Sequence, residues 1–203
     1  MKKLVSAALM SLPLLASAAP VNLVVNGDFE SVVLGAGTWT NVSTLAGWTR
    51  VGGPGTGFEV RNNVSGQAYL GKNFIELDTN GNTTIEQLFN SLVTSAGYTL
   101  SFAYSPRPGV AAASNGMDVF WNGRQLAPTM IGTGGGAHQW KVYSFDVYAA
   151  AGTNSLRFAS VGTNDSLGGS LDAVSLKVPE PSAFALAGLG VLGLWAARRR
   201  RAA

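Results

Sequence analysis

The chain has 203 residues, contains no cysteine, and has one histidine, His138. This composition excludes disulfide staples, cysteine-ligated metals, thiol nucleophiles and sites built from two histidines of one chain. Six of the 14 Lys and Arg residues stand at the two ends, so residues 19–181 keep the other eight against all 11 acidic residues. A basic surface for nucleic acid is therefore not expected in the body of the protein.

The first residues have the pattern of a secretory signal. Two lysines at residues 2–3 precede a short apolar stretch over 4–15, and an A-x-A cleavage site ends at Ala18. We place the cut after Ala18, because a cut one residue later would leave Pro20 directly behind the bond. Residues 1–18 are thus predicted to be a signal peptide that passes the chain to the Sec translocon.

The middle of the chain, residues 19–178, predicts one domain built from short strands. Residues 98–104 alternate large apolar with small side chains at a period of two, which is typical of a half-buried strand. Further strands are predicted at 74–77, 84–89, 117–121, 140–147, 155–159 and 170–176. Asn122-Gly123 follows an apolar run and predicts a type I′ hairpin. About ten strands without an intervening helix indicate an all-β sandwich or jelly roll.

Two acidic segments stand near the two ends of this domain. In residues 171–176, Asp172 is in phase with Val174 and Leu176, so it points inward if those two face the core. A buried carboxylate needs a partner or a cation. Residues 26–30 form a carbonyl-rich acidic turn of the kind that calcium accepts. Two alternatives stay open for Asp172: structural calcium, or hydrogen bonds from backbone amides or an arginine.

The C-terminal end, residues 179–203, has three parts. Pro179, Glu180 and Pro181 are followed by an apolar run over 183–197 and then by Arg198, Arg199, Arg200 and Arg201. Fifteen helical residues span about 22 Å, somewhat short of the roughly 30 Å hydrocarbon core. Ser182 and snorkelling arginines supply part of the difference, so we predict a transmembrane helix over about 182–197. The arginines orient the tail toward the cytoplasm.

This order of parts resembles the PEP-CTERM sorting signal of Gram-negative bacteria. The resemblance implies an exosortase as partner and processing near Pro179, Glu180 and Pro181. It further implies a transient membrane anchor, and then a place at the cell surface or outside the cell, beside exopolysaccharide and biofilm components. An ordinary C-terminal anchor with a proline-rich lead-in is the alternative.

A second resemblance concerns the domain itself. Short segments at 26–30, 47–48, 74–78, 98–102 and 171–176 are similar to galactose-binding-like jelly rolls, an architecture that many carbohydrate-binding modules share. The resemblance implies that the first and last segments are neighbours and hold a structural calcium, with Glu30 and Asp172 as side-chain ligands. No other cofactor is expected.

Ligand-binding candidates follow from how proteins bind sugars, through aromatic faces with polar side chains alongside. Arg107 lies between two prolines on a loop that follows a core strand, and Tyr104 ends that strand. We take Tyr104, Arg107 and Trp121 as the tentative ligand-binding residues.

An enzyme is not expected. Glu76 and Asp78 stand two apart on one strand, roughly 7 Å between Cα atoms, a distance that suits glycoside hydrolysis. Ile75 and Leu77 supply the opposite, core-facing side, so the two acids are predicted on the solvated side.

The leading hypothesis is an exported, non-catalytic surface protein that binds an extracellular polysaccharide. One alternative is a purely structural surface protein without a small ligand, and the other is a secreted glycoside hydrolase. Exposed coplanar aromatic rings would favour the first and their absence the second, whereas a desolvated carboxylate pair would favour the third.

Overall fold

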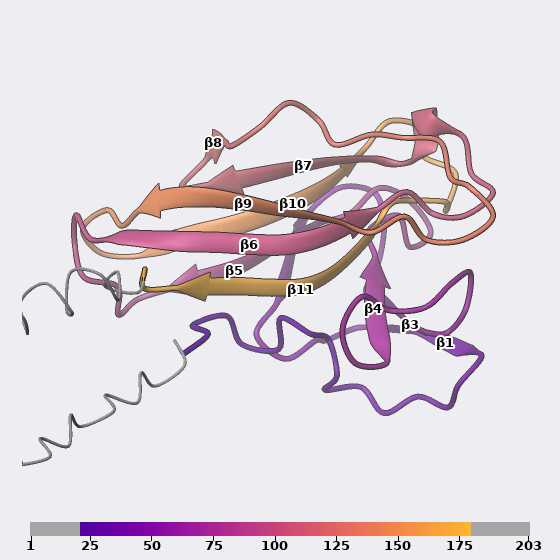
Figure 1. Cartoon of the computed structure of the whole chain (residues 1–203), viewed down its shortest axis with the longest axis horizontal. Coiled ribbons are helices and arrows are strands. Elements are labelled where there is room, and N and C mark those ends of the chain that lie inside the picture. The colour runs from indigo at the N-terminus through magenta and orange to yellow at the C-terminus, as the bar shows by residue number, and fades with distance from the viewer. Residues whose placement is uncertain (1–20, 180–203) are drawn as a thin grey trace, which may run out of the picture.

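The computed structural model describes residues 21–179, which form two antiparallel sheets packed face to face (Figure 1). The larger sheet has the order β1 (Thr38–Val42), β3 (Phe58–Asn62), β4 (Asn73–Glu76), β11 (Ser170–Lys177), β6 (Gly97–Ser105) and β9 (Lys141–Tyr148). The smaller has the order β2 (Thr49–Gly52), β5 (Thr84–Phe89), β10 (Asn154–Val161), β7 (Gly116–Trp121) and β8 (Arg124–Gln125). A single 3₁₀ turn, η1 (Ala112–Ser114), precedes β7. The predicted all-β sandwich is confirmed.

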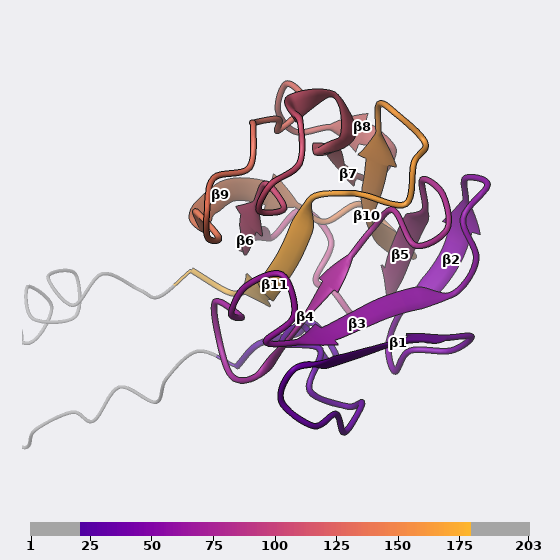
Figure 2. The same cartoon turned by 90° about the vertical axis from the view of Figure 1, so that its right-hand side faces the viewer.

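The two sheets lie against each other (Figure 2). The core between them is built largely from aromatic and branched side chains. Phe102 of β6 meets Phe158 of β10 edge to face, with ring centroids 4.9 Å apart. Trp48 packs beside Phe158 at 6.1 Å and beside Phe29 at 5.8 Å. Such aromatic contacts add to the free energy gained from burying the rings, so they fix how the sheets face each other.

The first and last segments of the domain lie side by side, as the resemblance implied. The Leu23 amide donates to the Leu176 carbonyl at 2.9 Å, and the Val174 amide donates to the Gly27 carbonyl at 2.8 Å. A side chain at Gly27 would collide with the Val174 carbonyl, since a Cβ there would lie 2.0 Å from that oxygen. Glycine is therefore required at this junction.

The predicted hairpin at Asn122-Gly123 is confirmed. Both residues have positive φ, 50° and 78°, as a type I′ turn requires, and Trp121 pairs with Arg124 across the turn. The seven predicted strands are found within one or two residues of their expected ends. The strands β1, β2, β3 and β8 were not predicted.

Several predictions fall outside the described residues. These are the signal peptide with Ala18, the processing residues Glu180 and Pro181, the helix over about 182–197, and Arg198, Arg199, Arg200 and Arg201. Within 21–179, no helix is long and apolar enough to cross a membrane.

Candidate functional site: a groove on the six-stranded sheet

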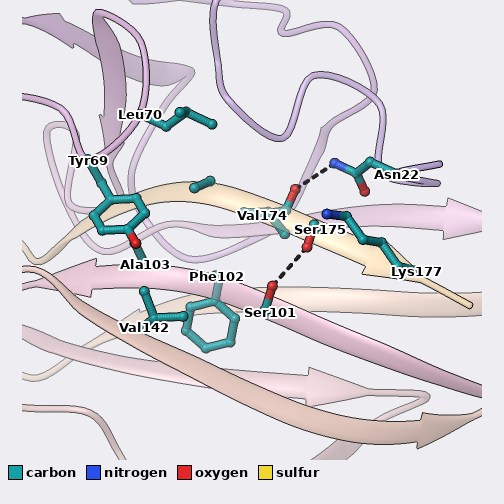
Figure 3. A pocket seen from close by; sticks show the side chains of 11 residues that line it. Asn22, Tyr69, Leu70, Ser101, Phe102, Ala103, Val142, Val174, Ser175 and Lys177 are labelled. Carbon is teal, nitrogen blue, oxygen red and sulfur yellow. Dashed lines mark hydrogen bonds between the residues drawn. The ribbon is translucent and has the colours of Figure 1, made fainter. Parts of the chain in front are cut away.

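The outer face of the larger sheet carries an open groove of about 290 Å³ over β6 and β11 (Figure 3). Tyr69 and Leu70, from the loop between β3 and β4, stand at one end of it, and Asn22 and Lys177 stand at the other. The floor and sides are formed by the remaining lining residues, Ser101, Phe102, Ala103, Val142, Ala173, Val174 and Ser175. The groove thus combines one aromatic ring with hydroxyl, amide and ammonium groups.

Strand register places two serine hydroxyls on the floor of the groove. Ser101 of β6 pairs directly with Ser175 of β11, and their hydroxyls hydrogen-bond at 2.8 Å. Ala103 lies two residues further along the same face and is opposite Val142 of β9. Because residues two apart share a face, these small side chains leave room above the sheet.

Tyr69 is the aromatic group of the groove, and its side chain is 48% exposed. Its ring stands 6.2 Å from that of Trp140 at an interplanar angle of 63°, so the two rings are not coplanar. These two rings do not form the coplanar pair that would have favoured polysaccharide binding. The groove offers the single exposed ring of Tyr69, which can pack against the C–H face of a sugar.

Asp172 holds the loop that carries Tyr69. The backbone amides of Tyr69 and Leu70 donate to Asp172 Oδ2 at 2.8 and 2.9 Å, and the Ala173 amide donates to Oδ1 at 2.6 Å. Burial raises the pKa of Asp172 to about 7, although these amides lower it. Of the two alternatives left open for this carboxylate, the structure shows the hydrogen bonds from backbone amides.

The phase predicted for Asp172 is wrong, because β11 contains a bulge. The register with β6 shifts between Asp172 and Ser175, and Ala173 adopts a positive φ of 50°. An extra residue on one strand reverses which face the following side chains occupy. Asp172 therefore lies on the outer face, covered by the Tyr69 loop, while Val174 and Leu176 face the core.

Glu30 binds the C-terminal end of the same loop, where β4 begins. Its Oε1 accepts the amides of Lys72 and Asn73 at 2.6 and 2.7 Å. Glu30 Oε1 and both oxygens of Asp172 thus accept backbone amides. Within residues 21–179, no group of three or more His, Cys, Asp or Glu side chains is placed to hold a metal. Calcium at Glu30 and Asp172 stays a prediction of the resemblance.

A buried ion cluster lies beside the groove region on the outer face of β3 and β4. It consists of Glu59, Arg61, Glu76 and Arg107. Glu76 accepts Arg107 Nη1 at 2.6 Å and lies 3.0 Å from Arg61 Nε, which also donates to Glu59 at 2.6 Å. The negative charges of the two carboxylates thus compensate the positive charges of the two guanidinium groups.

The predicted solvated position of Glu76 and Asp78 is wrong, since both side chains are buried. Loops cover this part of the outer face and exclude water from it. Desolvation raises the pKa of Glu76 to about 7 and also raises the pKa of Glu59 and of Asp78. A desolvated carboxylate pair, Glu59 and Glu76, therefore exists, but both acids are ion-paired with arginine and line none of the three described hollows.

The structure does not bring the three ligand-binding candidates together. Tyr104 faces the core and donates its hydroxyl to the Asn115 carbonyl. Trp121 is also buried, with Nε1 donating to the Tyr148 carbonyl at 2.9 Å. The guanidinium group of Arg107 is ion-paired with Glu76. Neither aromatic ring offers a face to a ligand, and the groove is instead formed by residues that sequence reasoning did not select.

The fold is that of a carbohydrate-binding module. The structure called TmCBM61, solved in complex with β-1,4-galactotriose, aligns over 78% of this chain and 99% of its own, with a TM-score of 0.50 and 15% identity. A CBM35 structure from Paenibacillus barcinonensis aligns over 70% of this chain and 100% of its own, with a TM-score of 0.43 and 19% identity. The predicted carbohydrate-binding-like jelly roll is confirmed at the level of fold.

Two curated proteins are similar in sequence, both described as multifunctional-autoprocessing repeats-in-toxin. The protein of Vibrio vulnificus is 31% identical over 156 residues and that of Vibrio cholerae serotype O1 is 33% identical over 153 residues. These matches cover 77% and 75% of this chain but only 3% of each toxin. The chain thus spans a small part of the length of these relatives.

The C-terminal end carries a sorting motif. Residues 177–201 match the family described as the PEP-CTERM protein-sorting motif, which confirms the resemblance drawn from the proline pair, the apolar run and the arginines. The motif indicates a chain that is exported and sorted to the cell surface.

Proposed function

We propose that this chain is an exported, non-catalytic protein whose domain binds an extracellular polysaccharide in the groove of Figure 3. The observation that carries the proposal is the exposed ring of Tyr69, which stands at the end of a groove that also holds the Ser101 and Ser175 hydroxyls, on a fold used by carbohydrate-binding modules. The sorting motif supports a location where such polymers occur.

Each part of the groove has a distinct task in this proposal. The face of Tyr69 packs against a sugar ring, and the Ser101 and Ser175 hydroxyls exchange hydrogen bonds with sugar hydroxyls. At the other end, the ammonium of Lys177 supplies up to three donors. The Asn22 side chain is used within the protein, since it donates to the Val174 carbonyl at 3.1 Å and accepts the amides of Val24 and Leu176.

The test is binding of residues 19–178, which contain both sheets, to a panel of polysaccharides that includes β-1,4-galactan. Tyr69→Ala should remove most of the binding. Tyr148→Ala is the matched control, because Tyr148 is also a well-exposed tyrosine of this domain but does not line the groove. If both variants keep the saturable binding of the parent domain, the binding site lies outside this groove. If the parent domain does not bind, the purely structural alternative is favoured.

The role in an exopolysaccharide matrix is part of the same proposal, and exosortase is its proposed partner. In a host that has the protease, mature protein should lack the residues beyond the Pro179–Pro181 segment. Intact-mass measurement of protein recovered from the cell surface and from the medium gives the processing site. A full tail on the mature protein would support an ordinary anchor instead.

A further inference from the structure

One end of the sandwich gathers both ends of the domain and three connections; we call it the chain-end face. It comprises the β5–β6 loop (residues 90–96), the β9–β10 loop (149–153), the β7–β8 turn (122–123), and the residues where the described chain begins and ends. Hydrogen bonds join these segments: Thr153 donates to Asn90 at 2.9 Å, Ser95 to Ala149 at 2.8 Å, and Asn122 to Asn154 at 2.8 Å. Figure 1 shows β11 ending on the side where β6 begins.

Large apolar side chains are exposed on the chain-end face. They are Val21, Leu88, Val93, Tyr148 and Val178, and Val93 and Tyr148 are each 68% exposed. A hollow of about 410 Å³ lies among them, lined by Leu23, Leu88, Phe89, Asn90, Ser91, Leu92, Tyr98 and Val178. Two of the exposed side chains, Leu88 and Val178, line the hollow directly, and exposed apolar surface around a hollow is typical of an interaction site.

The charge of the chain-end face is one-sided. Residues 21–25, 88–97, 121–125, 147–156 and 174–178 contain no Asp or Glu, whereas they contain Arg124 and Lys177. The nearest acidic residue along β9 is Asp146, which is paired across the sheet with Thr99. Apolar side chains, an amphipathic tyrosine and two cations suit the interface of a bilayer. Glu180, two residues after Val178, is the nearest acidic residue beyond the end of β11.

The sequence beyond the described chain specifies where such a bilayer would be. The structure describes the chain as far as Pro179, next to Val178 on the rim of the hollow. An uncharged apolar run of 15 residues, 183–197, begins four residues later and is followed by four arginines. A segment of that kind in a membrane would keep the chain-end face within a few residues of the lipid.

We propose that the chain-end face docks on the lipid surface while the C-terminal segment is still attached. Val93 and Leu88 enter the headgroup boundary, Tyr148 lies at the interface, and Lys177 and Arg124 meet lipid phosphates. A patch of this size binds weakly alone, so the tether supplies the high local concentration that makes docking effective. Removal of the tail releases the domain with its groove unchanged. This inference does not depend on carbohydrate binding.

The test uses the full chain in vesicles of phosphatidylethanolamine and phosphatidylglycerol. Because the chain has no cysteine, single-cysteine variants can be labelled cleanly with an environment-sensitive fluorophore. Val93→Cys reports on the chain-end face. Val51→Cys is the control: it is exposed on β2, whose neighbours Arg50 and Gly52 pair with Ile85 and Thr84 at the far end of β5.

The expected result is a blue shift and a gain in emission for the label at residue 93, together with quenching by lipids that carry a spin label near the headgroup. The label at residue 51 should behave as it does in water. Equal spectra at both positions would overturn the proposal. A blue shift without lipid quenching would also overturn it, since a second copy or the apolar run of the same chain would then cover the face.

Discussion

Arg61 joins the two buried acids of the ion cluster, so its removal should strongly destabilise the folded domain. It contacts Glu59 and Glu76, and the side chains of all three are nearly inaccessible to water. Methionine at this position keeps much of the volume and removes the charge. Glu59 and Glu76, which are directly paired between β3 and β4, would then face each other with only Arg107 nearby.

The loss can be estimated from comparable cases. Removing one partner of a buried ion pair costs about 3–5 kcal/mol, because it leaves an uncompensated buried charge. For a domain of this size, that corresponds to a fall in Tm of roughly 6–20 °C. The pair Arg157–Glu86, at 2.6 Å on the other sheet, is the comparison: Arg157 is 45% exposed although Glu86 is nearly buried, so Arg157→Met should cost less than Arg61→Met.

The stability that Arg61→Met loses should depend on pH. Burial raises the pKa of Glu76 to about 7 from an ordinary value of 4.5. As the pH falls, Glu76 therefore binds a proton at a higher pH in the folded protein than in the unfolded chain. This difference in pKa stabilises the folded protein fully at pH values below the pKa of Glu76 in the unfolded chain. The stabilisation is lost as the pH rises through the pKa of Glu76 in the folded protein. Removing Arg61 raises the folded pKa further, so Arg61→Met should lose more stability at about pH 8 than at about pH 5.

Thermal unfolding followed by circular dichroism, for parent, Arg61→Met and Arg157→Met at both pH values, measures these differences. Equal losses in the two variants, or a loss in Arg61→Met that does not change with pH, would refute the account of the cluster.

Three further outcomes are expected. Gly27→Ala should cost about 3 kcal/mol because its Cβ would meet the Val174 carbonyl, whereas Gly136→Ala, where nothing lies near, should leave the Tm unchanged. Asp172→Ala should cost about 2–4 kcal/mol from lost charge-assisted hydrogen bonds and should weaken polysaccharide binding, since the Tyr69 loop is released. A chelator should leave the Tm of the parent domain unchanged if amides alone hold that loop, and a chelator-sensitive Tm would instead show the calcium that the resemblance implies.

Sequence periodicity predicted most of the fold because the central strands alternate cleanly. Residues 98–102 bury every second side chain, and the strand expected there is found as β6. Strand β3 was missed because its charged residues, Glu59 and Arg61, suggest a wet surface. Their burial depends on loops far away in sequence, which no local pattern contains.

The groove was harder to predict than the sheets. Tyr69 lies in a glycine-containing loop without any period, so its only sequence signal is an aromatic-apolar pair, Tyr69-Leu70, among small and polar residues. Ser101 and Ser175 are ordinary strand residues until register places them opposite each other. The bulge after Asp172 could not be foreseen, because alanine rarely adopts a positive φ.

The most direct test of the central claim is a binding isotherm of the parent domain, Tyr69→Ala and Tyr148→Ala against one polysaccharide selected from the panel. The account predicts saturable binding by the parent and by Tyr148→Ala, and a loss of affinity on the order of tenfold or more in Tyr69→Ala, because hot-spot aromatic residues contribute at least that much. Equal affinities for all three proteins would contradict the assignment of the groove as the binding site.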